Sequence, residues 1–208
     1  MKRALLALAW CGLTAATASA QALRSFVLDP DHTQVLFAAD RFGFTPVEGR
    51  FERVQGVLRL DPQTPETATL EAVIDAGSFS TGHEGRDREM TGPNWLDVAA
   101  FPTIRFDAAG AQLDGEDAAI VPGELTLRGL TRPVSLSVRL NGRGAEPGSG
   151  QPSLGFTAEA TLDRRDFGMT GASGLIGDEI TVRIHALAQL GRPPPNLTGV
   201  EQLPPPRR

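Results

Sequence analysis

The sequence predicts an all-β domain of about eight antiparallel strands, and three observations lead to this prediction. Short segments between residues 25 and 190 alternate apolar and polar residues with a period of two, as half-buried strands do. Glycine, proline, asparagine and aspartate separate these segments at spacings typical of hairpins. The 208 residues are enough for one domain with a substantial core.

Each alternating segment has one apolar face. The segments cover residues 34–39, 58–61, 68–76, 104–108, 121–128, 134–140, 154–162 and 180–190. In the fourth segment, Phe106 shares a face with Ile104 and alternates with Arg105. Because successive side chains of a strand point to opposite faces, we expect Phe106 to face the interior.

Residues between the segments predict the connections. Residues 113–117 contain an Asp-Gly turn, residues 128–133 form a tight reversal, and residues 141–152 form a longer glycine-rich loop. Residues 84–90 are charged and contain no proline, which predicts a short helix. The apolar residues within 92–102 follow no period, so we expect an ordered connection that packs over one end of the sheet.

Eight antiparallel strands can form either a sandwich or a closed barrel. A barrel of about eight strands has no edge strand and can hold one small ligand. Many of the inward positions carry alanine, and small side chains leave space inside. The pattern therefore favours a barrel modestly and leaves the sandwich open.

The first 20 residues predict a secretory signal peptide. Lys2 and Arg3 precede a short apolar run, and Ala18-Ser19-Ala20 forms an A-x-A cleavage site. The run is too short to span a bilayer comfortably, and the bulky Trp10 before Cys11 disfavours a lipoprotein signal. We therefore expect cleavage after Ala20 and a location in the bacterial periplasm, with the outside of the cell as the alternative.

The mature chain is expected to be acidic and to lack several reactive side chains. Removal of Lys2 and Arg3 changes the net charge from −5 to −7, which disfavours nucleic acid as a partner. Lys2 and Cys11 are the chain's lysine and cysteine, so the mature protein has no Schiff-base lysine, thiol nucleophile, disulfide or cysteine-held metal. We expect no cofactor.

Residues 21–190 form the predicted domain, and residues 191–208, with two triple-proline runs, predict a disordered tail.

Polar clusters of the sequence favour surface positions. The carboxylates of residues 84–89 could form an acid/base or metal site with His83. Arginines alternate with them, however, which indicates a solvated helix face. A three-histidine metal site would need His32, His83 and His185 together, so we expect no metal.

Several short motifs occur in order along the predicted domain. The first is Asp-Pro-Asp-His-Thr at residues 29–33, followed by an alternating strand, and the last is Gly-Asp-Glu-Ile at residues 177–180. Between them lie Val47–Phe51, Gly56–Leu58, Ser78–Gly82, Arg86–Asp87, Phe101–Phe106, Gly123–Val134 and Arg165–Gly168. The ordered set resembles the YceI-like family of exported bacterial polyisoprenoid-binding proteins. Met90 and residues 94–96 depart from the family pattern in ways that could alter the pocket mouth.

The resemblance implies an extended antiparallel barrel, lipocalin-like in shape, with a long isoprenoid chain inside. It specifies the predicted fold as a roughly eight-stranded lipocalin-like barrel with a short helix and an ordered loop near one end. It implies a binding or carrier protein, not an enzyme, for amphiphilic isoprenoid lipids such as a polyprenyl phosphate or a prenylated quinone. The residues expected in the pocket wall are Phe37, Leu70, Ile74, Phe106, Leu127, Phe156, Val182 and Ile184.

Three further hypotheses remain open at this point. Arg86 and Asp87 could gate the pocket mouth or contact a polar head group, or form an ordinary surface ion pair. A hydrolase or isomerase could use the same pocket with His32 and Asp87, and a binding module could recruit a protein partner through the proline-rich tail. The expected partner is an isoprenoid lipid. Transient contact with a membrane or a membrane protein is compatible with the sequence, and the oligomeric state, including a dimer, is left open.

Overall fold

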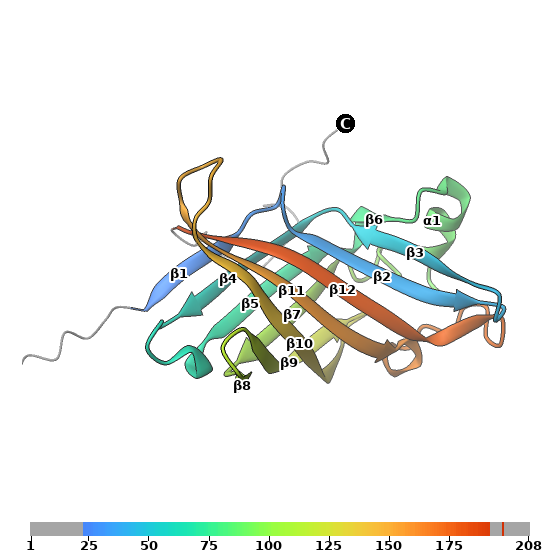
Figure 1. Cartoon of the computed structure of the whole chain (residues 1–208). Helices are drawn as coiled ribbons and strands as arrows, with labels where there is room; N and C mark the ends of the chain where they lie inside the picture. Colours follow the sequence, from blue (N-terminus) through green and yellow to red (C-terminus); the bar gives the residue numbers. More distant parts are fainter. Residues whose placement is uncertain (1–22, 192–196, 198–208) are drawn as a thin grey trace, which may run out of the picture.

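The computed structural model describes residues 23–191 and Leu197, and its strands close into an antiparallel barrel (Figure 1). The strands are β1 (Arg24–Leu28), β2 (Gln34–Arg41), β3 (Thr45–Phe51), β4 (Val54–Leu60), β5 (Thr69–Asp75), β6 (Phe79–Ser80), β7 (Thr103–Ala109), β8 (Gln112–Asp114), β9 (Ala118–Leu127), β10 (Leu130–Ala145), β11 (Pro152–Asp163) and β12 (Ile176–Leu190). The helices are α1 (Glu84–Met90) and the short 3₁₀ helices η1 (Pro65–Thr67), η2 (Ala76–Ser78) and η3 (Arg164–Phe167).

Three pairs of consecutive strands each occupy one position in the ring. β1 and β2 follow one another along β12. The next position holds β4, which pairs with β1, and β3, which pairs with β2. The position after that holds β5, which pairs with β4, and β6, which pairs with β3. The ring continues through β7, β9, β10 and β11 to β12. This arrangement confirms the predicted eight-stranded fold and decides for the barrel over the sandwich.

Strand β12 joins the two ends of the domain. One of its edges pairs with β11. Its other edge pairs first with β2 and then with β1, so that Val182 lies opposite Phe37 and Leu190 lies opposite Phe26. Residues 29–33 form a turn that separates β1 from β2 along this seam.

One end of the barrel, here called the α1 end, is covered by the segment between β6 and β7 (Figure 1). Helix α1 coincides with the helix predicted for residues 84–90, and the His83 ring accepts a hydrogen bond from the Arg86 backbone N–H at 3.2 Å. Residues 91–102 follow, and their Trp95 and Leu96 side chains are 6% and 7% exposed. The predicted ordered connection over one end of the sheet is therefore confirmed.

The loop predicted for residues 141–152 is wrong in its extent. β10 and β11 continue to pair as far as Ala145 and Pro152, past an irregularity after Leu140, so the connection contains only residues 146–151. The glycines of this stretch hide the strand in the sequence, because they interrupt the apolar alternation while their backbones still pair.

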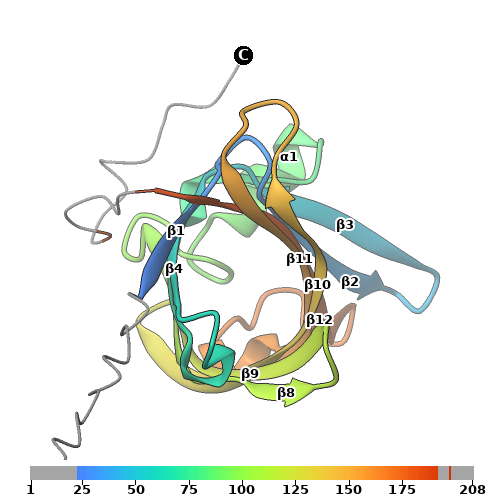
Figure 2. The same cartoon turned by 60° about the vertical axis from the view of Figure 1, so that its left-hand side comes forward.

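The opposite end, where β1 begins, is called the β1 end, and Figure 2 looks into the barrel from this side. Leu197 packs outside the ring in a small cluster with Val57 and Val73. The predicted signal peptide and the remainder of the predicted tail lie outside the described residues. Within residues 23–191 and 197, no helix has the length and apolar character required to cross a membrane.

Candidate functional site

The barrel encloses a cavity of about 1280 Å³. Its wall is built from alternate residues of the strands, as in β12, where Val182, Ile184 and Ala186 line the space while Arg183 and His185 point outward. The lining runs along β12 from Ile176 to Ala186, which corresponds to about 33 Å along a strand and about 25 Å along a barrel axis at the usual tilt. The volume exceeds the roughly 300–1,000 Å³ typical of small-molecule pockets.

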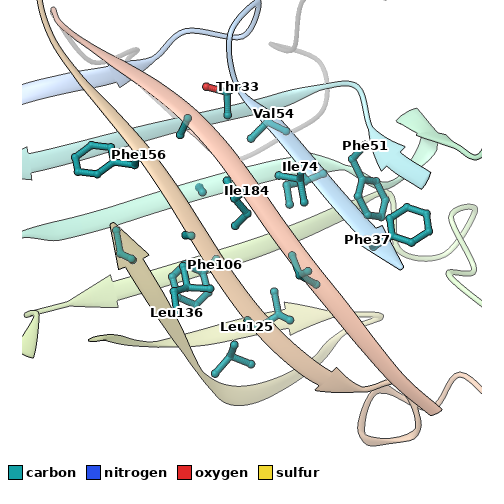
Figure 3. Close-up of a pocket in the computed structure, with 18 of the residues that line it drawn as sticks. Thr33, Phe37, Phe51, Val54, Ile74, Phe106, Leu125, Leu136, Phe156 and Ile184 are labelled. Atoms are coloured by element: carbon teal, nitrogen blue, oxygen red, sulfur yellow. The ribbon is translucent and has the colours of Figure 1, made fainter. Parts of the chain in front are cut away.

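All eight residues predicted for the pocket wall line this cavity. They are Phe37, Leu70, Ile74, Phe106, Leu127, Phe156, Val182 and Ile184. Figure 3 draws several of them together with Phe51, Val54, Leu125 and Leu136, which come from other strands of the ring. The residues meet because their strands are all neighbours in one closed sheet. Their contact with a ligand remains a prediction.

Aromatic rings on the wall lie against glycines of neighbouring strands, and this packing keeps the interior open. The Phe37 ring occupies the position that a Cβ of Gly49 would need, with Cζ 2.3 Å from it. The Phe106 ring lies over Gly123 in the same way, with Cζ 2.4 Å from the corresponding position. A ring seated on a glycine lies along the wall, whereas a β-carbon at that position would direct it toward the barrel axis.

Arg164 closes the α1 end with a fully buried guanidinium. Its side chain is 1% exposed and donates hydrogen bonds to the carbonyls of Met169, Gly171, Ile176 and Gly177 at 2.8–3.2 Å. It forms an ion pair with Asp178 at 3.0 Å, and its guanidinium lies 5.0 Å from the Trp95 ring centre. These bonds satisfy the buried charge and fix the connection between β11 and β12 under the cavity.

Arg86 and Asp87 also lie at the α1 end, where both bind Thr81. Arg86 Nε donates to the Thr81 hydroxyl at 2.7 Å, and the Thr81 backbone N–H and hydroxyl donate to Asp87 at 2.9 and 2.5 Å. Arg86 lines the cavity. These contacts hold α1 against the strand end, and a role of either residue at a pocket mouth remains a prediction.

The cavity wall includes a residue whose hydroxyl oxygen is buried without a hydrogen-bond partner among the described residues. Thr33, at the end of the turn between β1 and β2, lines the cavity and is 5% exposed. Within the described part of the chain, its Oγ1 is the buried hydroxyl oxygen that makes no hydrogen bond. Figure 3 shows it among apolar side chains of the wall.

Charged groups with shifted pKa values lie on the outside. A hydrogen bond from Arg59 lowers the pKa of Glu71, whose neighbours Leu70 and Ala72 face inward. A hydrogen bond between the His32 Nδ1 and Asp29 at 2.9 Å raises the pKa of His32.

The residues of the catalytic alternative are not brought into the cavity. Of the described residues, those that line it include neither His32 nor Asp87. No group of three or more His, Cys, Asp or Glu side chains with the arrangement of a metal site occurs among residues 23–191 and 197.

Sequence reasoning missed Thr33 and Arg164, although the alternation contained the signal for both. Thr33 lies two residues before Val35 and four before Phe37, so it shares their face of the strand. Arg164 lies two residues after Leu162 and continues that inward series. Extending each inward series by one residue would have placed both side chains inside. Both residues are polar, so an inward series defined by apolar residues alone stops before it reaches them.

Comparison with known proteins places this barrel among related chains. Residues 26–188 match the YceI-like domain. A UPF0312 protein of Pseudomonas savastanoi pv. phaseolicola is 32% identical over 174 residues, which cover 82% of this chain and 89% of that protein. Protein YceI of Salmonella agona is 31% identical over 186 residues, covering 88% of this chain and 96% of the relative.

Solved structures show the same fold at lower sequence identity. Burkholderia cenocepacia BcnA aligns with a TM-score of 0.70 at 21% identity, covering 77% of this chain and 98% of BcnA. A polyisoprenoid binding domain from Saccharophagus degradans, implicated in plant cell wall breakdown, aligns with a TM-score of 0.64 at 15% identity. The alignment covers 82% of this chain and all of that domain.

Proposed function

The chain belongs to the YceI-like family, and from this premise we propose that it is a periplasmic binding or carrier protein for amphiphilic isoprenoid lipids. The lipid is a polyprenyl phosphate or a prenylated quinone, held in the barrel without chemical change. The polyisoprenoid-binding description of the Saccharophagus degradans domain supports this ligand class.

The cavity is the observation that carries the proposal. It combines a volume of about 1280 Å³ with a wall made mostly of aliphatic and phenyl side chains. Its lining extends over about 25 Å along the barrel axis, which suits a long hydrocarbon chain better than a compact metabolite. Each 100 Å² of tail surface removed from water contributes about 2.5 kcal/mol before the entropic cost of binding.

The catalytic alternative has less support. It requires His32 and Asp87 to act on a substrate in the pocket, yet the His32 side chain is 68% exposed and is held by Asp29 on the outer side of its turn. Asp87 is engaged by Thr81. The third hypothesis, a partner bound through the proline-rich tail, concerns residues outside those described.

The periplasmic location rests on the signal peptide read from residues 1–20. N-terminal sequencing of the exported protein should give Gln21 as the first residue. A mature protein that retains Cys11 with an attached lipid would contradict this part of the proposal.

Organic extraction of the purified protein, followed by mass spectrometry, tests the ligand class. We expect an isoprenoid lipid in stoichiometric amount. Ala160→Trp should reduce the extracted lipid, because Ala160 lines the cavity and an indole would fill part of it. Thr161→Trp is the matched control, since Thr161 is the next residue of β11 and is exposed.

Equal lipid loads in the wild type and both variants would contradict a ligand inside the barrel. Recovery of only non-isoprenoid lipids would contradict the proposed class. Both variants should first be shown to unfold cooperatively, so that lost lipid is not confused with a lost fold.

A further inference from the structure

The tip of the β2–β3 hairpin, at the α1 end, carries two exposed phenylalanines. Phe44 is 89% exposed and Phe42 is 43% exposed. β6 pairs with the far end of β3, at Arg50 and Phe51, and the part of the hairpin that carries the tip extends beyond the ring (Figure 2). Leu175, in the connection between β11 and β12, is 54% exposed and lies beside the tip, where its carbonyl accepts the Phe42 backbone N–H at 2.9 Å. The side chains of Phe42, Phe44 and Leu175 are here called the hairpin-tip patch.

The turn at the tip holds Phe42 in a backbone conformation that phenylalanine rarely adopts. Phe42 and Gly43 have φ values of 59° and 70°, and the Phe44 N–H donates to the Arg41 carbonyl at 3.1 Å. This pattern is typical of a type I′ turn, for which Asn-Gly and Asp-Gly are preferred. A bulky side chain in the left-handed region is strained, and the Asp40 carboxylate supports the turn by accepting the Gly43 N–H at 2.7 Å. The ring is therefore kept at the tip against the local backbone preference, which indicates a function for the ring itself.

The hairpin-tip patch is continuous with the wall of the cavity. Arg164 closes the α1 end, and beside it Phe42 and Leu175 line the cavity although both are more than 40% exposed. The apolar surface thus runs from the interior to the outside at this point. At the β1 end, Leu113 is also exposed and lines the cavity, but residues 114–117 next to it contain three carboxylates. The apolar rim at the α1 end therefore fits a lipid surface better than the acidic rim at the β1 end.

The size and charge of the patch favour a lipid surface over a second copy of the chain. At about 200 Å² for a whole side chain, its three exposed fractions amount to about 370 Å² of apolar surface. A stable dimer buries about 800 Å² on each partner, roughly twice this area. The Arg41 guanidinium lies 4.2 Å from the Phe42 ring centre and forms no ion pair with a described acidic residue. A cation beside exposed rings suits the phosphates that border the acyl region of a bilayer.

We propose that the hairpin-tip patch docks the protein on a lipid bilayer, with its three apolar side chains among the acyl chains and Arg41 at the level of the phosphates. The inference rests on the proposed lipid-binding function and adds the surface at which the isoprenoid is exchanged. Docking at the tip brings the apolar rim of the cavity to the bilayer, so that the chain of the ligand passes between them without crossing water. Three side chains provide far less apolar surface than a membrane-spanning helix, and the docking is therefore reversible.

Flotation of the full mature protein with vesicles of phosphatidylcholine and about one quarter phosphatidylglycerol tests the docking surface. Phe44→Ser should weaken vesicle binding about 10-fold, as expected for the loss of one inserted aromatic side chain. Uptake of a C20 isoprenoid alcohol from loaded vesicles should slow by a similar factor. Phe44 is not among the residues that line the cavity, so the variant should bind the same alcohol, added without vesicles, as tightly as the wild type does.

Leu113→Ser is the matched control, because it removes an exposed apolar side chain from the opposite end of the cavity. It should leave vesicle binding unchanged. Phe42→Asn supplies the Asn-Gly pair that a type I′ turn prefers, so it should keep or raise the unfolding midpoint while it weakens vesicle binding. A lowered midpoint with unchanged vesicle binding would assign the Phe42 ring to the fold and overturn its role in docking.

A wild-type protein that does not float with the vesicles, equal binding by Phe44→Ser, or an equal loss in Leu113→Ser would overturn the docking surface. A wild-type dimer in sedimentation equilibrium that Phe44→Ser converts into a monomer would replace the bilayer by a second copy of the chain. Failure of the wild type to bind the isoprenoid alcohol in the absence of vesicles would overturn the proposed function instead, and so the two failures are distinguishable.

Discussion

Replacement of Gly123 by alanine should drive the Phe106 ring away from the barrel wall. The new Cβ would lie 2.4 Å from Cζ and 2.8 Å from Cε2 of Phe106, and 2.7 Å from the Asp107 carbonyl oxygen. An ordinary contact begins near 3.4 Å, so the ring would have to retreat by about 1 Å toward the cavity. The strand carbonyl has less freedom to move.

The expected change in stability follows from two opposing effects. Overpacking of this kind destabilises by about 1–3 kcal/mol. Alanine also restricts the unfolded chain, which offsets about 0.4–1 kcal/mol. Gly123→Ala should therefore lower the free energy of unfolding by about 1–2 kcal/mol. Phe106→Ala alone should lower it by about 3 kcal/mol, the lower part of the range for buried phenylalanine, because one face of the ring borders open space.

The double variant separates ring contact from backbone contact. Without the ring, the alanine at position 123 clashes only with the Asp107 carbonyl, so the double variant should be about 1 kcal/mol more stable than the sum of the single effects predicts. Urea unfolding followed by Trp95 fluorescence measures all three, since Trp95 is the only tryptophan of the predicted mature chain.

Additivity within about 0.5 kcal/mol would refute the seating of the ring on Gly123.

Both single variants should also carry less extractable lipid per folded molecule. Arg105→Ala is the outward control: its side chain pairs with Asp107 and Glu71 on the outer face, so its loss should change stability by less than about 1 kcal/mol and leave the lipid content unchanged. Heavy destabilisation by Phe106→Ala with normal lipid retention would assign Phe106 to the core alone.

Other perturbations probe the ends of the barrel. Arg164→Met should lower the free energy of unfolding by at least about 3 kcal/mol in urea denaturation, because it leaves the buried carbonyls of residues 169–177 that Arg164 binds without donors; a loss below 1 kcal/mol would contradict its role in closing the α1 end. The bond to Asp29 raises the pKa of His32 from 6.5, so it stabilises the fold fully below that pH and the contribution disappears as pH rises through the raised value. Because the side chain is 68% exposed, the effect is under about 1 kcal/mol, and His32→Gln should flatten the stability profile over this window; an unchanged profile would refute the linkage. Elemental analysis of untagged protein should find no stoichiometric transition metal, and loss of lipid on removal of a bound metal would contradict this expectation.

The period of two carried most of the sequence prediction, because it assigns each strand residue to one of two faces. All eight predicted wall residues line the cavity for this reason. The same rule failed at β3, where Gly49 occupies an inward position and the Phe37 ring fills its space. Thr33 and Arg164 obey the period but are polar, so an inward series defined by apolar residues alone ends before it reaches them.

Other features depend on contacts that local pattern does not encode. Alternation is the same in a sandwich and a barrel, and only the pairing of β1 and β2 with β12 decides between them. The burial of Arg164 depends on carbonyls of the β11–β12 connection that become acceptors only once this segment folds beneath the cavity. Residues 92–102 were recognised as ordered by their apolar content, but their partner Gly171 lies far along the chain, with the Trp95 ring against it.

The seam along β12 also determines when the barrel can close. Phe26 pairs with Leu190, so the barrel cannot close until nearly the whole domain has been synthesised. Such a topology has a high contact order, and its closure requires the entropy of a very long loop to be overcome late in folding. If the chain is exported as we propose, this topology is an advantage, because the N-terminal strands cannot complete a stable barrel before the C-terminal strand has been translocated.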